Sequence, residues 1–101
     1  MTTAPVQDVF IYFMTRIEGM PFTKDVVEAH VAHLKRLDDA GRLVLSGPFR
    51  DGKGGMVAFR AADLAEAEST ARSDPFISQG FETYMTRQLE VACRANGFLM
   101  G

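Results

Sequence analysis

The sequence predicts a single α+β domain, in which a four-stranded antiparallel sheet carries two helices on one face. Three observations support this fold class. One early segment is dense in β-branched and aromatic residues, two later segments repeat apolar residues at helical spacing, and the elements follow in the order β-α-β-β-α-β. The 101 residues are enough for one domain, 1–101, and too few for two.

The first strand is predicted over Val6 to Met14, which reads VQDVFIYFM. Its alternate side chains form two apolar sets, Val9, Ile11 and Phe13 on one face and Phe10, Tyr12 and Met14 on the other. Right-handed crossovers place both helices on the same face of a sheet. The other face then needs a cover, so we expect at least a homodimer that packs through the sheet.

The first helix is predicted from an N-cap at Thr23 to a stop at Gly41. Its apolar stripe contains Val27, Val31 and Leu34, with Val26, His30 and Leu37 beside them and His33 near the edge. The second helix is predicted from about Asp63 to Arg72, with Leu64, Ala67 and Ala71 at helical spacing. Pro75 limits this helix, because the residue before a proline disfavours helical geometry.

Three further strands complete the sheet. Arg42 to Phe49 is the second strand, and Met56 to Phe59 returns after a glycine-rich hairpin. Within the second strand we expect Leu43, Leu45 and Phe49 to face inward. Gly47 and Pro48 interrupt it, which indicates an edge strand, a bulge or close approach of a ligand. Glu82 to Val91 is the last strand, and the apolar tail over 93–101 is expected to be docked rather than free, against a surface that the sequence does not identify.

Composition excludes several classes of protein. The apolar share is 47%, the charged share 24% and the formal net charge −2, so no basic surface for nucleic acid or anionic membrane is expected. The single cysteine, Cys93, cannot form an intramolecular disulfide. No apolar run is long enough to span a bilayer, and the N-terminus lacks the basic region of a secretory signal. A cytoplasmic protein is therefore expected.

The chain has two histidines, His30 and His33, three residues apart on the first helix. Either could act as a general base near neutral pH. His30 lies within the apolar stripe, which favours a core side chain over a direct role, whereas His33 at its margin is better placed to face a cleft. Asp74 could orient a histidine, or could cap the turn before Pro75. The spacing of the histidines matches no metal motif, so no metal site is expected.

An RNA-recognition module shares this element order and stacks bases on aromatic residues of its first and third strands. Val9 to Tyr12 resembles part of its first-strand pattern. The third strand, Gly54 to Phe59, offers only one aromatic residue and no basic start. With its net negative charge, the chain is not expected to bind nucleic acid.

Several short motifs in order closely resemble the YCII-related (YciI-like) family. They are Ala32-His33-Leu34, Gly41-Arg42-Leu43, Ser46-Gly47-Pro48, Gly54-Gly55 and Asp74-Pro75-Phe76. The resemblance spans nearly the whole chain and implies a ferredoxin-like α+β sandwich of the dimeric α/β-barrel superfamily. It also implies a histidine on the first helix paired with an aspartate before Pro-Phe, which by position are His33 and Asp74.

The resemblance further implies a substrate cleft that contains Ser46, Gly47 and Pro48. Many members carry an arginine three residues before the histidine, where this chain has His30, so His30 is a candidate substrate-binding residue. Arg16 could replace that arginine in binding an anionic substrate. One lineage of the family dehydrochlorinates a chlorinated hydroxyhydroquinone.

We therefore expect a lyase or isomerase that acts on a small cyclic or aromatic molecule, with His33 moving the proton and Asp74 orienting it. No cofactor is expected, because proton transfer alone can drive such a step. The alternative is a non-catalytic ligand-binding or accessory module in which the pair is a structural hydrogen bond. A haem-linked or cofactor-free oxidative role is a third possibility and rests on analogy of fold alone.

Overall fold

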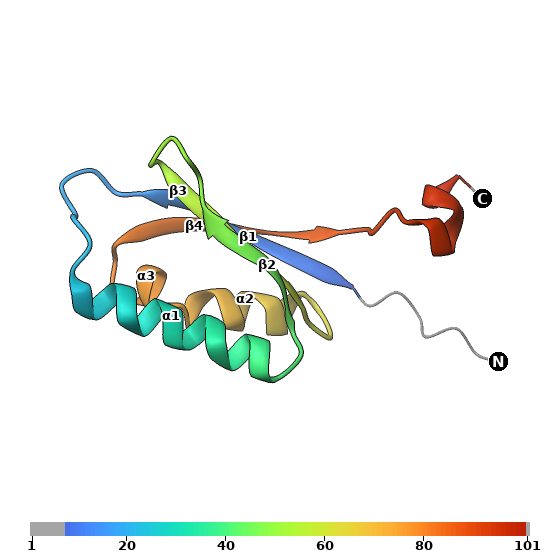
Figure 1. Cartoon of the computed structure of the whole chain (residues 1–101), viewed down its shortest axis with the longest axis horizontal. Helices are drawn as coiled ribbons and strands as arrows, with labels where there is room; N and C mark the ends of the chain where they lie inside the picture. Colours follow the sequence, from blue (N-terminus) through green and yellow to red (C-terminus); the bar gives the residue numbers. More distant parts are fainter. Residues whose placement is uncertain (1–7, 101) are drawn as a thin grey trace.

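Four antiparallel strands form the sheet, and α1, α2 and α3 lie on one of its faces (Figure 1). The computed structural model describes residues 8–100. Its elements are β1 (Val9–Arg16), α1 (Lys24–Asp39), β2 (Leu43–Pro48), β3 (Gly54–Arg60), α2 (Leu64–Arg72), α3 (Pro75–Ser78), β4 (Glu82–Leu89) and the 3-10 helix η1 (Arg94–Leu99). The strand order is β2-β3-β1-β4. The predicted fold class is confirmed; Val6 and Gln7 of the predicted first strand lie outside the described residues.

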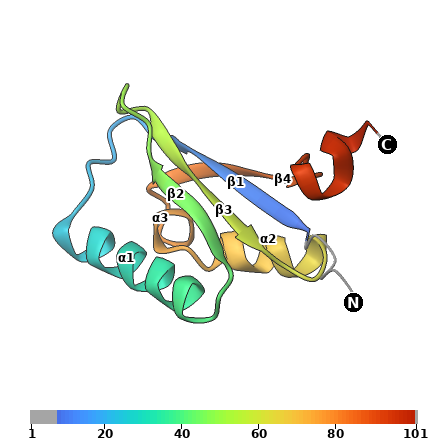
Figure 2. The same ribbon diagram turned by 45° about the vertical axis from the view of Figure 1, so that its right-hand side comes forward.

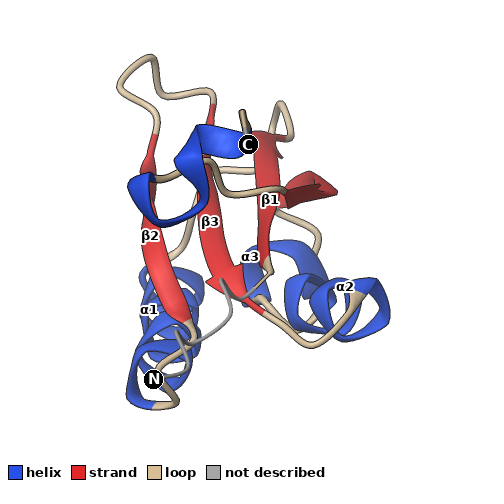
Figure 3. Ribbon diagram, turned by 90° about the vertical axis from the view of Figure 1, so that its right-hand side faces the viewer, coloured by secondary structure: helices blue, strands red, loops and turns tan. Residues whose placement is uncertain are grey.

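The core lies between the central strands and the helices. Phe10, Tyr12 and Met14 of β1 are buried there beside Val57 and Phe59 of β3. Figure 3 shows α1 behind β2 and shows α2 and α3 on the β1 side, so the helices divide this face between them.

The other face of the sheet has no helix among the described elements (Figure 1). Cross-strand register places Phe13 between Met56 and Met85, and Ala58 between Leu45 and Ile11. Met85 and Leu45 are more than 60% exposed. We call this surface the open face; its apolar members are Val9, Ile11, Phe13, Leu45, Met56, Ala58, Met85 and Leu89. Both sides of β1 are apolar, and the described helices cover only one of them.

Helix α1 begins and ends where its sequence predicts. The Thr23 hydroxyl accepts a hydrogen bond from the Val26 amide at 3.1 Å, and Gly41 adopts a φ of 70° after the last turn. Only part of its apolar stripe is core. Val26 is buried, whereas Val27 and Val31 are 39% and 40% exposed and line a cavity described below.

Strand β2 is an edge strand with a register shift between Leu43 and Leu45. The prediction that Leu45 and Phe49 face inward is wrong, because these side chains are 64% and 42% exposed. A bulge adds one residue to a strand, so it reverses which alternate positions face the core.

The chain after β3 contains one element that the sequence analysis missed. Helix α2 begins as predicted, with the Asp63 carboxylate accepting from the Glu66 amide at 2.8 Å, although Leu64 is exposed rather than inward. After it, Pro75 opens the single turn α3, in which Asp74 is the N-cap. This turn brings Asp74 into the core, where it is fully buried.

The C-terminal tail does not dock on the described part of the chain. Figure 2 shows it beyond the end of β4, away from the helices. Phe98 and Leu99 are about half exposed and Met100 is 92% exposed, so residues 8–100 offer the tail no docking surface. Within residues 8–100, no helix has the length and apolar character to cross a membrane. The cytoplasmic location stays a prediction.

Candidate active site

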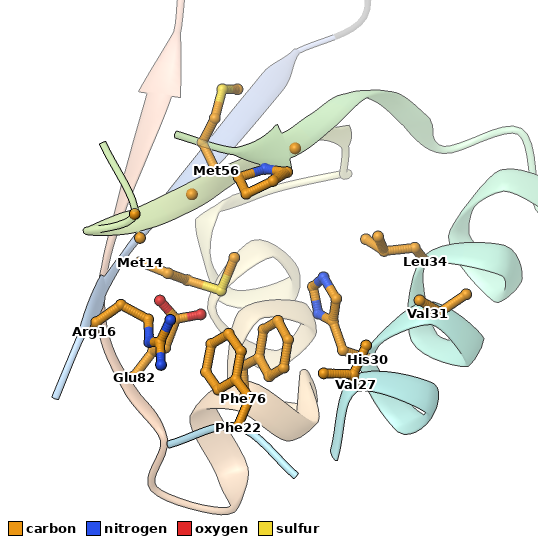
Figure 4. Close-up of a pocket in the computed structure, with 15 residues that line it drawn as sticks. Met14, Arg16, Phe22, Val27, His30, Val31, Leu34, Met56, Phe76 and Glu82 are labelled. Carbon is orange, nitrogen blue, oxygen red and sulfur yellow. The ribbon is translucent and has the colours of Figure 1, made fainter. Parts of the chain in front are cut away.

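A cavity of about 420 Å³ opens between the β2–β3 hairpin, α1 and the start of β4 (Figure 4). Most of its wall is apolar, from methionine, valine, leucine and phenylalanine side chains and the glycines of the hairpin. Its polar side chains are Arg16, His30 and Glu82. A mainly apolar cavity with a few convergent polar groups is typical of a small-molecule site.

Asp74 lies behind this cavity and accepts hydrogen bonds from three groups. The Tyr12 hydroxyl donates to Oδ2 at 2.6 Å, and the Phe76 amide donates to Oδ1 at 3.0 Å. His30 Nδ1 lies 2.8 Å from Oδ1 and 2.9 Å from Oδ2. Burial alone would raise the pKa of the Asp74 carboxyl, but the hydrogen bonds from His30 and Tyr12 outweigh it and hold that pKa below its usual value.

Asp74 is therefore an anion at neutral pH, which decides the protonation of its two side-chain partners. Burial, and then the charge of Asp74, raise the pKa of the Tyr12 phenol, so Tyr12 stays a donor. An ionised carboxylate only accepts hydrogen bonds, so His30 must donate from Nδ1. In a neutral imidazole this leaves Nε2 as the free acceptor.

His30 connects this buried group to the cavity. Figure 4 shows its imidazole projecting from α1 into the space, and Nε2 makes no hydrogen bond within residues 8–100. The ring also stacks on Phe76, with ring centres 3.9 Å apart and planes 15° apart. Contacts on two sides hold the ring in one orientation, with its free nitrogen available to a bound molecule.

The predicted contact between His33 and Asp74 is wrong, because Asp74 pairs with His30. His33 is buried and lines a second cavity of about 340 Å³, which Arg36, Arg42 and Thr70 also line. Its Nε2 has no hydrogen-bond partner among the described residues. Burial lowers the pKa of His33 more than the charge of Asp74 raises it. Three residues of helix turn a side chain by about 300°, so His30 and His33 point about 60° apart and one of them misses Asp74.

Arg16, Phe22, Phe76 and His30 form a continuous stack along one side of the cavity (Figure 4). The guanidinium carbon of Arg16 lies 3.8 Å from the centre of the Phe22 ring, and the Phe22 and Phe76 rings are 4.3 Å apart and 8° from parallel. Arg16 was expected in the site from the sequence, whereas Phe22 was not. A phenylalanine in the loop before α1 gave no signal of its position.

The β2–β3 hairpin forms the opposite wall. Gly47 and Pro48 line the cavity as the resemblance implied, but Ser46 is not among its lining residues. A Cβ atom on Gly55 would lie 2.6 Å from the Gly47 carbonyl oxygen. Only glycine at this position therefore allows the two strands to approach so closely.

Tyr12 and Glu82 were also missed, although both carried a signal. Tyr12 is the one hydroxyl-bearing side chain on the buried face of β1, and a buried phenol needs a partner. Glu82 shares the inward alternation of Tyr84 on β4 and is only 5% exposed. A charged residue at an inward-facing position of a strand predicts either a partner or a ligand.

The family model of the YCII-related domain matches residues 9–90, which include every strand and helix that forms this cavity. The chain belongs to the YCII-related family. The uncharacterized protein YjpA of Bacillus subtilis (strain 168) is a relative of this chain. The two are 32% identical over 71 residues, which make up 70% of this chain and 84% of that protein.

A solved structure shares the fold of this family member. The 5-chloro-2-hydroxyhydroquinone dehydrochlorinase TftG of Burkholderia phenoliruptrix AC1100, in complex with 2,5-dihydroxybenzoquinone, superposes with a TM-score of 0.69. The likeness covers 81% of this chain and 93% of that one at 20% identity. At 20% identity, this structural likeness supports the ferredoxin-like fold of the chain alone.

Proposed function

We propose that this protein is an enzyme that uses His30 for acid/base chemistry on a small molecule bound in the cavity, with Asp74 as the residue that orients His30. The observation that carries the proposal is the pairing of His30 Nδ1 with the fully buried Asp74, at 2.8 Å, beside a cavity that His30 also lines. This pairing leaves Nε2 to exchange a proton with a bound substrate. His30 thus takes the role that the sequence analysis assigned to His33.

The step begins when His30 Nε2 accepts a proton from a carbon or hydroxyl of the substrate. The imidazolium formed is stabilised by Asp74, which Tyr12 and the Phe76 amide hold in place. In an isomerase the same proton returns to another atom of the substrate. In a dehydrochlorination the electron pair of the broken bond forms a double bond, and chloride leaves with its own bonding pair. Neither step changes the oxidation state of the protein or needs another reactant.

The TftG comparison supports a ring compound as the substrate class, because that neighbour is a dehydrochlorinase with 2,5-dihydroxybenzoquinone bound. The stack of Phe22 and Phe76 along the cavity favours a flat, mainly apolar molecule as well. We therefore propose a small cyclic or aromatic substrate from which a proton can be removed.

The test is chloride release from 5-chloro-2-hydroxyhydroquinone, with His30→Gln as the test variant and His33→Gln as its matched control. Loss of a general base costs about 10²- to 10⁴-fold in rate, so we expect at least a 100-fold loss in His30→Gln and less than a threefold change in the control. Equal turnover by the parent protein and His30→Gln would exclude His30 as the base.

The alternative function is a non-catalytic small-ligand module. The three hydrogen bonds to Asp74, one of which caps α3, favour it, because they give Asp74 a structural role independent of catalysis. The two functions differ in what happens to a bound compound. NMR spectra of 5-chloro-2-hydroxyhydroquinone during incubation show a new product if the protein is an enzyme. They show binding without conversion beyond the protein-free rate if it is a ligand module.

We also propose that the protein is a homodimer that packs through the open face. Phe13, Leu45 and Met85 are between 38% and 64% exposed on that face. A contiguous apolar surface of this kind commonly marks an interface between subunits. Its oligomeric mass in solution tests the proposal.

A further inference from the structure

Glu82 is a buried acidic residue of the cavity for which the proposed proton transfer gives no role. It is the first residue of β4, its side chain lines the cavity, and only 5% of the residue is exposed. Its Oε2 atom has no hydrogen-bond partner among the described residues. A buried carboxyl oxygen without a partner destabilises a folded protein, so folding alone does not explain this residue.

Arg16 is the cross-strand neighbour of Glu82 but does not neutralise it by direct contact. The two residues are paired in the β1–β4 register, yet they form no ion pair within 4 Å in the described structure. The guanidinium of Arg16 lies instead over the Phe22 ring. Both side chains line the cavity, and Figure 4 places them on one side of the Phe22–Phe76 stack with His30 on the other.

The opposite charges of Arg16 and Glu82 decide which ligand group suits this end of the cavity. A carboxylate of the ligand would approach the acidic Glu82, and an ammonium group would approach Arg16. A neutral group avoids both repulsions. A hydroxyl group can donate to an ionised carboxyl and can also accept from a protonated one, so it satisfies Glu82 in either state.

We propose that Glu82 is a specificity-determining residue that hydrogen-bonds a hydroxyl of an uncharged substrate at the end of the cavity opposite His30. The inference rests on the proposed function, because it takes this cavity to be the substrate site. It differs from the sequence-based expectation that Arg16 holds an anion. Arg16 and Glu82 together select a neutral, hydroxyl-bearing molecule, while His30 acts on the far side of the aromatic stack.

Three probes with one aromatic body test the inference by binding alone. They are toluene, which has no polar group, 4-methylphenol, which adds a neutral hydroxyl, and 4-methylbenzoate, which adds an anion. Affinities are measured by NMR titration of the ¹⁵N-labelled protein. For the parent protein we expect 4-methylphenol to bind about tenfold or more tightly than either of the others, since a hydrogen bond to a buried carboxyl discriminates by about that factor.

Glu82→Leu is the test variant, and Glu90→Leu is the matched control, because Glu90 is an exposed residue beyond the other end of β4. In Glu82→Leu the preference for 4-methylphenol over toluene is expected to fall to less than threefold. 4-Methylbenzoate is expected to bind more tightly than to the parent protein, since Arg16 then has no opposing charge. The control retains the parental order. If Glu82→Leu does not fold, Glu82→Gln is expected to gain affinity for 4-methylbenzoate for the same reason.

Absence of a hydroxyl preference in the parent protein overturns the inference, and so does its persistence in Glu82→Leu. Neither result depends on turnover. If His30→Gln keeps full activity while Glu82→Leu loses the hydroxyl preference, the proposed base is wrong and the role of Glu82 stands. If His30→Gln is inactive and the hydroxyl preference is absent, the proposed function stands without this inference.

Discussion

His30 Nδ1 lies 2.8 Å from Oδ1 of Asp74, although the two residues are 44 positions apart in the sequence. The contact joins the middle of α1 to the N-cap of α3. Phe76 holds both partners, His30 by ring stacking and Asp74 through its backbone amide, and the Tyr12 hydroxyl also donates to Asp74. The pair is therefore oriented before any ligand binds, and such preorganisation is what proton transfer requires.

Tyr12→Phe removes one of the donors to Asp74 and keeps the shape of the side chain. A buried carboxylate that loses a partner costs about 1–3 kcal/mol in the free energy of unfolding, and we expect a loss in that range. Tyr84→Phe is the matched control, because the Tyr84 hydroxyl donates to the partly exposed Glu68 carboxylate at 3.1 Å. Urea unfolding of both variants is the measurement, and equal losses would contradict the central role of Asp74.

Asp74→Asn tests the charge of this residue through the pH dependence of stability. The folded-state pKa of Asp74 lies below its unfolded value of about 3.9. Its ionisation therefore stabilises the fold above that unfolded value, and the contribution is lost as the pH falls from there toward the folded pKa. We expect the difference in unfolding free energy between the parent and Asp74→Asn to shrink below about pH 4. A difference that is constant from pH 7 to pH 2 would contradict the account.

His33 is expected to stay neutral and to lie outside the reaction. Because burial lowers its folded pKa below the ordinary 6.5, its neutral form is favoured in the fold. The stabilisation is present above that unfolded value and is lost as the pH falls toward the folded pKa. NMR titration should therefore give a midpoint below about 6.5 for the His33 imidazole. A midpoint above that value would contradict this assignment.

Glu82→Leu is expected to stabilise the protein while it removes the hydroxyl preference. Burial raises the pKa of the Glu82 carboxyl, an effect that Arg16 lessens. A group with a raised folded pKa stabilises the fold when protonated, and this contribution is lost as the pH rises through the folded pKa. At pH 7 we therefore expect Glu82→Leu to unfold at a higher temperature, by a few degrees for each kcal/mol gained. A lower Tm than the parent would show that Glu82 serves the fold.

The homodimer proposal predicts a mass of about twice the 11.1 kDa of one chain. Met85→Lys, which places a charge on the open face, is expected to give the monomer mass by light scattering at micromolar concentration. Leu64→Lys is the control, because Leu64 is similarly exposed but lies on α2. A parent protein that is already monomeric would contradict the proposal.

Much of the fold could be predicted because its signals are local. Thr23 and Asp63 cap their helices as expected, and Gly41 ends α1 at a positive φ that glycine tolerates. The exposure of Leu45 could not be predicted, because the bulge of β2 is defined by its pairing with β3 rather than by its own residues. The one-turn helix α3 is too short to show helical periodicity.

The histidine that contacts Asp74 lies on the predicted helix, but it is His30 rather than His33. His30, Arg16, Gly47 and Pro48 line the same cavity, and Asp74 contacts His30 from behind it. The choice between His30 and His33 depends on where α3 lies along α1, and that position comes from tertiary packing. The stack of Phe22 on Phe76 likewise joins a loop to a distant turn, so no spacing in the sequence indicates it.

The most direct test of the account is the tautomer of the His30 imidazole, measured by long-range ¹H–¹⁵N NMR. The chain has two histidines, so His33→Gln leaves His30 as the single imidazole signal. In its neutral form we predict a hydrogen on Nδ1, facing Asp74, and a bare Nε2 whose resonance shifts when the neutral probe 4-methylphenol is added. A hydrogen on Nε2 with a bare Nδ1 would contradict the pairing with Asp74 and remove the proposed base.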